Sequence, residues 1–97
     1  MEKIIFIVLA TINPHEKEAL QHYMEQMSVL YGQVEAISLQ KHTLKESTIG
    51  QGEFQLLLMV EFPSQKAWDD VFLSEAYKDL LPYREKAFTK LEGYFSQ

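Results

Sequence analysis

The chain has 97 residues, of which 46% are hydrophobic and 24% are charged. This length and composition predict a single globular domain, residues 1–97, with one hydrophobic core. The formal net charge of −5 repels phosphate backbones and anionic lipid headgroups, so neither nucleic acid nor a membrane surface is expected as a partner. The absence of cysteine excludes disulfides, thiolate metal sites and a thiol nucleophile, and it fits a cytoplasmic protein.

The first two elements are predicted to be a strand and a helix. Residues Lys3 to Ile12 are β-branched and apolar without alternation, which is typical of a strand covered on both faces. Asn13 and Pro14 then predict a helix N-cap and a first helical residue. Gly32 is expected to end the helix in the left-handed conformation. Between these limits the apolar residues recur at helical spacing, at Leu20, Tyr23, Met24, Met27, Leu30 and Tyr31.

The middle of the chain predicts two further strands. Residues Val34 to Lys45 have a mixed pattern that suits an edge strand, with Ile37 and Leu39 on one side and Val34, Ala36 and His42 on the other. Glu46 to Gly52 is predicted to be the hairpin connection. Phe54 to Phe62 is a second unbroken apolar run, which indicates a buried strand.

Two helices and a last strand are expected in the C-terminal part. Ser64 after Pro63 opens a short helix that places Ala67, Trp68, Val71 and Phe72 inward. Ser74 caps the next helix, and Pro82 is expected to kink or restart it because proline donates no backbone hydrogen bond. A strand near Thr89 to Phe95 completes the order β-α-β-β-α-α-β.

This order predicts an α+β protein with the ferredoxin-like split β-α-β fold, an antiparallel four-stranded sheet with helices on one face. The two unbroken apolar runs would then be the central strands. Both of their faces are apolar, so the helix-free face would leave five or six large side chains in water, each forgoing about 1.5 to 3 kcal/mol of burial. A patch of that size predicts a homodimer that packs sheet against sheet. The alternative is that residues Tyr94 to Gln97 shield this face.

The chain also resembles a known family. The segment Glu61-Phe62-Pro63-Ser64, followed by Ala67-Trp68, Ser74, Tyr77 and Arg84, is similar to the sequence pattern of the family called domain of unknown function 1330. Pro14, Tyr23 and Gly32 also fall where that family carries a proline, a tyrosine and a glycine. The family belongs to the dimeric α/β-barrel superfamily. The resemblance implies a dimer with a cleft between helices and sheet, and no settled reaction.

Arg84 is the most informative candidate for a site. It lies seven residues after Tyr77 and four after Leu80, on an otherwise apolar helix stripe. A guanidinium in that position must be paired or line a cavity. It is therefore a candidate to bind an anion or a carboxylate. The alternatives are a buried ion pair with a carboxylate such as Glu61, or a side chain that extends to solvent.

Tyr23, Tyr77 and His42 are the other candidate site residues. Tyr23 and Tyr77 could offer hydroxyls to the same cleft, although their spacing also suits the core. His42 is a candidate general base, or a solvated strand residue. Trp68 with Phe72 is interpreted as core. His15 and His22 are about 10 Å apart along a helix, too far to share a metal ion, and no cofactor or metal site is predicted.

Three functional hypotheses remain. The first is a dimeric protein that binds a small, anionic molecule in the cleft, with or without cofactor-independent catalysis. The second is a noncatalytic ligand-binding or assembly module in which Arg84 is structural. The third is a monooxygenase of the same superfamily, which is disfavoured because no residue stands out as an axial haem ligand.

Overall fold

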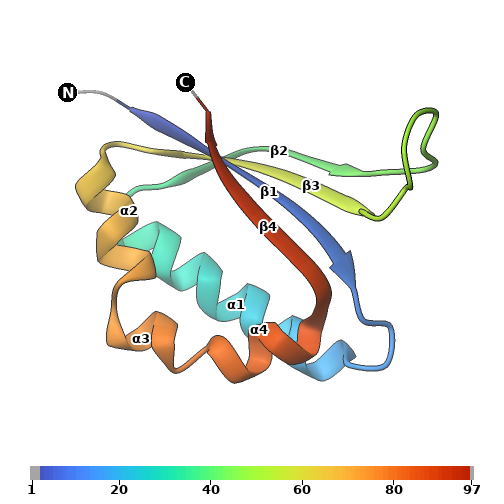
Figure 1. Ribbon diagram of the computed structural model, residues 1–97. Coiled ribbons are helices and arrows are strands. Elements are labelled where there is room, and N and C mark those ends of the chain that lie inside the picture. Colours follow the sequence, from blue (N-terminus) through green and yellow to red (C-terminus); the bar gives the residue numbers. More distant parts are fainter. Residues whose placement is uncertain (1–2, 97) are drawn as a thin grey trace.

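The computed structural model describes residues 3–96. One antiparallel sheet lies on a layer of helices (Figure 1). Its strands are β1 (Ile4–Ile12), β2 (Ile37–Thr43), β3 (Leu56–Phe62) and β4 (Phe88–Ser96). The helices are α1 (Lys17–Gln33), α2 (Gln65–Phe72), α3 (Glu75–Lys78) and α4 (Leu81–Ala87). None of the helices within residues 3–96 combines the length and the apolar character that crossing a membrane would require.

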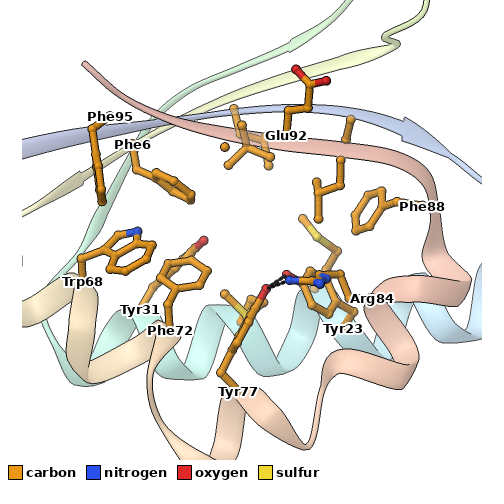
Figure 2. A pocket seen from close by; sticks show the side chains of 17 residues that line it. Phe6, Tyr23, Tyr31, Trp68, Phe72, Tyr77, Arg84, Phe88, Glu92 and Phe95 are labelled. Atoms are coloured by element: carbon orange, nitrogen blue, oxygen red, sulfur yellow. Dashed lines mark hydrogen bonds between the residues drawn. The ribbon is translucent and has the colours of Figure 1, made fainter. Parts of the chain in front are cut away.

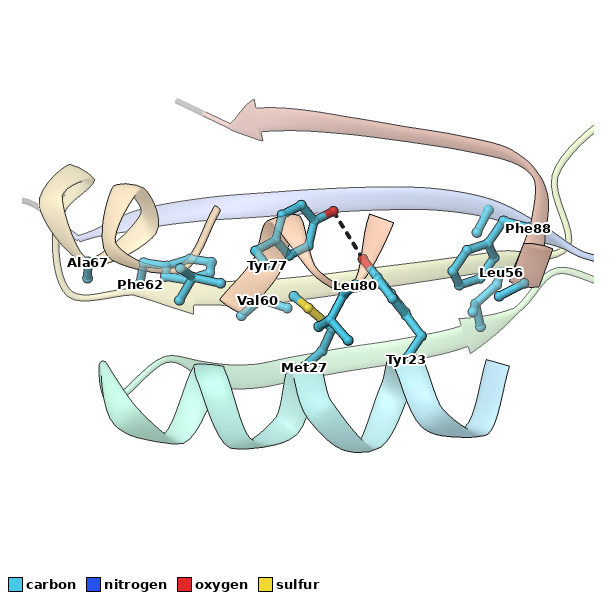
Figure 3. Close-up of a cluster of buried hydrophobic side chains, with 12 residues drawn as sticks. Tyr23, Met27, Leu56, Val60, Phe62, Ala67, Tyr77, Leu80 and Phe88 are labelled. Atoms are coloured by element: carbon cyan, nitrogen blue, oxygen red, sulfur yellow. Dashed lines mark hydrogen bonds between the residues drawn. The ribbon is translucent and has the colours of Figure 1, made fainter. Parts of the chain in front are cut away.

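The strand order explains the two unbroken apolar runs. The sheet runs β2-β3-β1-β4, so β1 and β3 are central and β2 and β4 form the edges, as predicted. On the helix-covered face, Val60, Phe62 and Leu56 of β3 pack with Met27 of α1 and Ala67 of α2 (Figure 3). The core is therefore built by one face of the central strands and one stripe of each neighbouring helix.

The predicted limits of the first helix were wrong at both ends. The Asn13 side chain accepts a hydrogen bond from the His15 amide at 3.1 Å, which closes a turn, and α1 begins only at Lys17. A long-range contact explains this, because the Asn13 amide donates to the Ala87 carbonyl at 2.8 Å and holds residue 13 at the end of α4. At the other end Gly32 stays helical, and Glu35 takes the left-handed conformation (φ 60°).

The helices after β3 follow the predicted capping pattern. Ser64 Oγ accepts a hydrogen bond from the Ala67 amide, and Ser74 Oγ accepts one from the Tyr77 amide, both at 3.1 Å. Pro82 occupies the first turn of α4, so the stretch predicted as one kinked helix is divided into α3 and α4. Each helix start is thus fixed locally by a side chain or by a proline.

Strand β2 differs from the predicted alternation. Its pairing with β3 shifts register between Ser38 and Gln40. Because of this shift, Ile37 lies opposite Glu61 and His42 lies opposite Leu57, so Ile37 and His42 share the helix-free face. The prediction that they lie on opposite sides was therefore wrong, for the physical reason that a one-residue irregularity reverses the facing of every later residue.

The helix-free face of the sheet is apolar at its centre. All four helices lie on the other side (Figure 1). Ile5, Ile7 and Leu9 of β1 alternate away from the helices, beside Leu57 and Met59 of β3, and all five side chains are partly exposed. We call these five residues the open face. The C-terminal segment does not shield it, because residues up to Ser96 form edge strand β4; Gln97 lies outside the described residues.

Gly93 of β4 makes room for a core ring. A Cβ atom at this position would lie 2.5 Å from Cζ of Phe6, so Gly93→Ala must push the Phe6 ring into the helix layer. We expect the variant to lose roughly 1 to 3 kcal/mol of unfolding free energy, the usual cost of overpacking. The measurement is urea unfolding. Gly32→Ala is the control: nothing lies within 4 Å of its Cβ, and the change should stabilise α1 by up to about 1 kcal/mol. Equal stabilities for both variants would contradict this account of Gly93.

Candidate functional site

A cavity of about 580 Å³ lies between the sheet and the helices. Phe6 of β1 and Phe95 of β4 line it from the sheet, and Trp68, Phe72 and Tyr31 line it from α2 and α1 (Figure 2). A volume of this order holds a small organic molecule. Most of the lining is aromatic or aliphatic, so the few polar atoms that reach the cavity decide which chemistry it offers.

The polar end of the cavity is formed by Arg84, Tyr77 and Tyr23. Arg84 Nη1 donates a hydrogen bond to Tyr77 Oη at 2.9 Å, and Tyr77 Oη lies 3.2 Å from Tyr23 Oη (Figure 2). The guanidinium carbon also lies 5.8 Å from the centre of the Tyr77 ring, within the range of a cation–π contact. The three predicted ligand-binding residues thus meet in one hydrogen-bonded chain.

Local structure places Arg84 in the cavity. The Arg84 amide bonds to the carbonyl of Leu80, the N-cap of α4, at 2.9 Å, and the Leu80 amide bonds to the Tyr77 carbonyl of α3 at 2.8 Å, so two successive contacts connect Arg84 to Tyr77 across the break. The side chain therefore keeps the helical relation to Tyr77 even though the helix restarts. Within residues 3–96 Arg84 forms no ion pair, and Glu61 lies instead 3.6 Å from Lys3 Nζ. The expected alternative of an Arg84–Glu61 pair was wrong, because Glu61 belongs to the helix-free face.

Two tyrosines of the cavity, Tyr23 and Tyr31, are held in the neutral form. Burial raises the pKa of Tyr23 far above the ordinary tyrosine value, Tyr77 raises it further, and Arg84 opposes the shift. Burial also raises the pKa of Tyr31. At neutral pH both side chains are therefore phenols that can donate a hydrogen bond. The site offers a fixed positive charge together with O–H donors, a combination that stabilises an anionic oxygen.

These pKa shifts predict loss of stability at alkaline pH. The unfolded chain releases tyrosine protons near pH 10, whereas the folded protein keeps those of Tyr23 and Tyr31, so stability is complete below about pH 10 and falls as the pH rises further. Urea unfolding at pH 8 and pH 11 measures the loss. We expect Tyr31→Phe to lose less stability than the parent between the two values, since it has one such phenol fewer. An identical loss in parent and variant would contradict the assignment.

His42 lies outside this site. It sits on the exposed edge strand β2, on the helix-free face, and its Nε2 lies 2.7 Å from the Gln40 side chain. The structure does not bring it near Arg84, so the two candidates for catalysis are not parts of one centre. Within the described residues no group of three or more His, Asp or Glu side chains is arranged to hold a metal ion. The polar chemistry of the cavity is that of the arginine and the phenols.

Sequence reasoning missed one polar group that borders the cavity, the indole nitrogen of Trp68. Trp68 was assigned to the core with Phe72, and the two rings do stack, with centroids 4.7 Å apart. Trp68 nevertheless lines the cavity, and its Nε1 is buried with no hydrogen-bond partner in the described part of the chain. The only signal in the sequence was that a buried tryptophan needs an acceptor for its N–H, and none was evident near it.

Comparison with known proteins supports the fold. Protein RPA0582 from Rhodopseudomonas palustris, of unknown function, has a TM-score of 0.84 at 14% identity, over 97% of this chain and 80% of its own. A dabb family protein with a ferredoxin-like fold from Mesorhizobium loti has a TM-score of 0.70 at 10% identity, over 100% of this chain and 97% of its own. A candidate antibiotic biosynthesis monooxygenase from Bacteroides thetaiotaomicron has a TM-score of 0.70 at 11% identity, over 99% and 89% respectively. No curated protein matches the sequence.

These identities are low, so the structural neighbours establish the fold alone. The fold is ferredoxin-like α+β, as the sequence predicted, and it is shared with dimeric α/β-barrel proteins. The sequence itself matches the family described as a domain of unknown function (DUF1330) over residues 6–92. Because this match spans most of the chain, the protein belongs to the DUF1330 family.

Proposed function

We propose that the protein is a homodimer that binds a small anionic molecule in the cavity between sheet and helices, with Arg84 as the anion-binding residue. The observation that carries the proposal is a guanidinium that faces an apolar cavity and forms no ion pair within residues 3–96. The Arg84 side chain is partly buried and hydrogen-bonds to Tyr77, so its positive charge is available to an anionic partner that enters the cavity. A carboxylate or another anionic oxygen on a ligand would supply that partner and would stabilise the site by charge-assisted hydrogen bonds.

The phenols give the proposal its geometry. Tyr77 Oη accepts a hydrogen bond from Arg84, and a second hydrogen bond joins the Tyr77 and Tyr23 hydroxyls. This second bond uses the O–H of one tyrosine, so the O–H of the other remains to donate into the cavity. An anionic ligand oxygen beside Arg84 would pair with the guanidinium and would accept a hydrogen bond from this phenol O–H. The same arrangement would stabilise negative charge that develops on a carbonyl oxygen, which is the form a cofactor-independent reaction would take here.

The homodimer is proposed from the open face. Five partly exposed aliphatic side chains at the centre of a sheet form a contiguous apolar patch, extended by Ile37 (54% exposed) and Tyr94 (50% exposed). Burial of such a patch against a second copy is the simplest closed arrangement. A structural neighbour from Bacteroides fragilis, described as a dimeric protein with a ferredoxin-like fold, supports the same assembly. The net charge of −5 supports the expectation that the protein does not bind nucleic acid. Its cytoplasmic location stays a prediction.

Binding of octanoate and of uncharged octanamide, measured by titration calorimetry, tests the proposed site. The parent should bind the carboxylate more tightly than the amide, and Arg84→Gln should remove that preference. If Arg84 is instead structural, the variant should lose thermal stability and retain the preference. A haem-degrading or quinol-forming monooxygenase is the remaining alternative, and one structural neighbour is named as a candidate antibiotic biosynthesis monooxygenase. The haem-degrading form predicts a Soret shift on haem titration.

A further inference from the structure

The indole nitrogen of Trp68 is a hydrogen-bond donor for which the folded chain supplies no acceptor within the described residues. This nitrogen, Nε1, is buried. A buried donor without an acceptor is rare in folded proteins and costs a substantial part of its hydration free energy. The ring borders the same cavity as Arg84, and its nitrogen lies on the side that faces Phe6 (Figure 2). An acceptor on a bound molecule would remove this cost.

Two aromatic rings, those of Phe72 and Tyr77, connect Trp68 to Arg84 along the cavity wall. Trp68 stacks on Phe72 with centroids 4.7 Å apart at an interplanar angle of 26°, and Phe72 contacts Tyr77 at 4.8 Å. Tyr77 in turn accepts the hydrogen bond from Arg84. The rings of Phe72 and Tyr77 therefore lie between the two polar points of the cavity, and a ligand that touches both points must extend past these rings.

The opposite wall favours a flat ligand. Phe6 meets Phe72 at 5.2 Å and Trp68 at 5.7 Å, in both cases edge to face, and Phe95 lies 5.6 Å from Phe6. These rings contact one another and form a packed aromatic cluster at the Trp68 end of the cavity. Such a surface packs best against another π system, which gains offset or edge-to-face contacts in addition to apolar burial.

We propose that the ligand is a flat, conjugated carboxylate that carries a hydrogen-bond acceptor at its far end, such as a carbonyl or an ether oxygen. Its carboxylate binds Arg84 and the phenols, its rings pack against the cavity side of Phe6 and Phe72, and its distal oxygen accepts from Trp68 Nε1. The distal group is an acceptor because an indole N–H can only donate. This assignment rests on the proposed anion site and adds the length, shape and second polar point of the ligand.

The test uses two naphthalene acids of almost equal size, 6-methoxy-2-naphthoate and 6-ethyl-2-naphthoate. They differ in one ether oxygen, and apolar burial alone would favour the ethyl compound. We expect the parent to bind the methoxy compound about tenfold more tightly, as a hydrogen bond to an otherwise unpaired buried donor would give. Titration calorimetry measures the ratio. Because Trp68 is the only tryptophan, its single indole N–H signal in an ¹H–¹⁵N spectrum should shift downfield with the methoxy compound alone.

Trp68→Phe supplies the matched variant, since it removes the N–H and keeps an aromatic ring. The methoxy preference should disappear in it, and any general loss of packing cancels in the ratio of the two compounds. Equal affinity of the parent for both compounds, or no binding of either, overturns this assignment of the ligand. The proposed anion site is judged separately by octanoate and octanamide, so it survives that result, and it fails if the parent shows no preference for the carboxylate or if Arg84→Gln retains that preference.

Discussion

Ile7→Lys is expected to convert the protein from a dimer to a monomer at micromolar concentration. Ile7 lies at the centre of the open face, paired with Met59 on one side and Tyr94 on the other. In a two-fold dimer the lysine enters the apolar interface once from each copy, and burial of an unpaired ammonium costs several kcal/mol. We expect association to weaken by about 1000-fold or more.

Sedimentation equilibrium measures this change, and circular dichroism checks that the variant remains folded. Val29→Lys is the matched control, because it makes the same kind of change at an exposed hydrophobic residue (53% exposed) on α1, away from the sheet. It should sediment like the parent. A parent that is already monomeric at micromolar concentration, or an Ile7→Lys variant that remains dimeric, would contradict the proposed interface.

Arg84→Gln is expected to lower the affinity for octanoate by roughly 10- to 100-fold, the range of a lost charge-assisted hydrogen bond. Affinity for octanamide should change little, because the uncharged amide gains no charge-assisted hydrogen bond from Arg84 and glutamine still offers an N–H donor. The free energy of unfolding should fall by only about 1 kcal/mol, since the variant loses one hydrogen bond between partly buried side chains.

Lys86→Gln controls for net charge. Lys86 lies on the same helix and is exposed, so the variant loses one positive charge outside the cavity. It should bind octanoate like the parent. If Lys86→Gln and Arg84→Gln weakened octanoate equally, the effect would come from the overall field of the protein, and the proposed role of Arg84 would fail.

Local signals predicted most of the fold. The unbroken apolar runs identified the two central strands, and the serine caps at Ser64 and Ser74 fixed two helix starts. These features depend on residues close together in sequence. The start of α1 was predicted wrongly because the bond from the Asn13 amide to the Ala87 carbonyl joins residues far apart in the chain. No pattern around Asn13 reports such a contact.

The candidate site was predictable only in part, for the same reason. Arg84 and Tyr77 stood out because a charge on an apolar helix stripe needs an explanation, and the structure brings them together with Tyr23. The unpaired state of Trp68 Nε1 was not predictable, since it depends on which atoms surround the indole after folding. The facing of His42 was likewise set by a register shift in β2 that the alternation of residues does not reveal.

A crystal structure of the protein grown with octanoate tests the central claim most directly. The account predicts the carboxylate inside the cavity, with an oxygen about 2.8 Å from a nitrogen of Arg84 and within hydrogen-bond distance of a phenol. Octanoate bound elsewhere, or bound in the cavity with its carboxylate turned away from Arg84, would contradict the claim that this arginine is there to hold an anion.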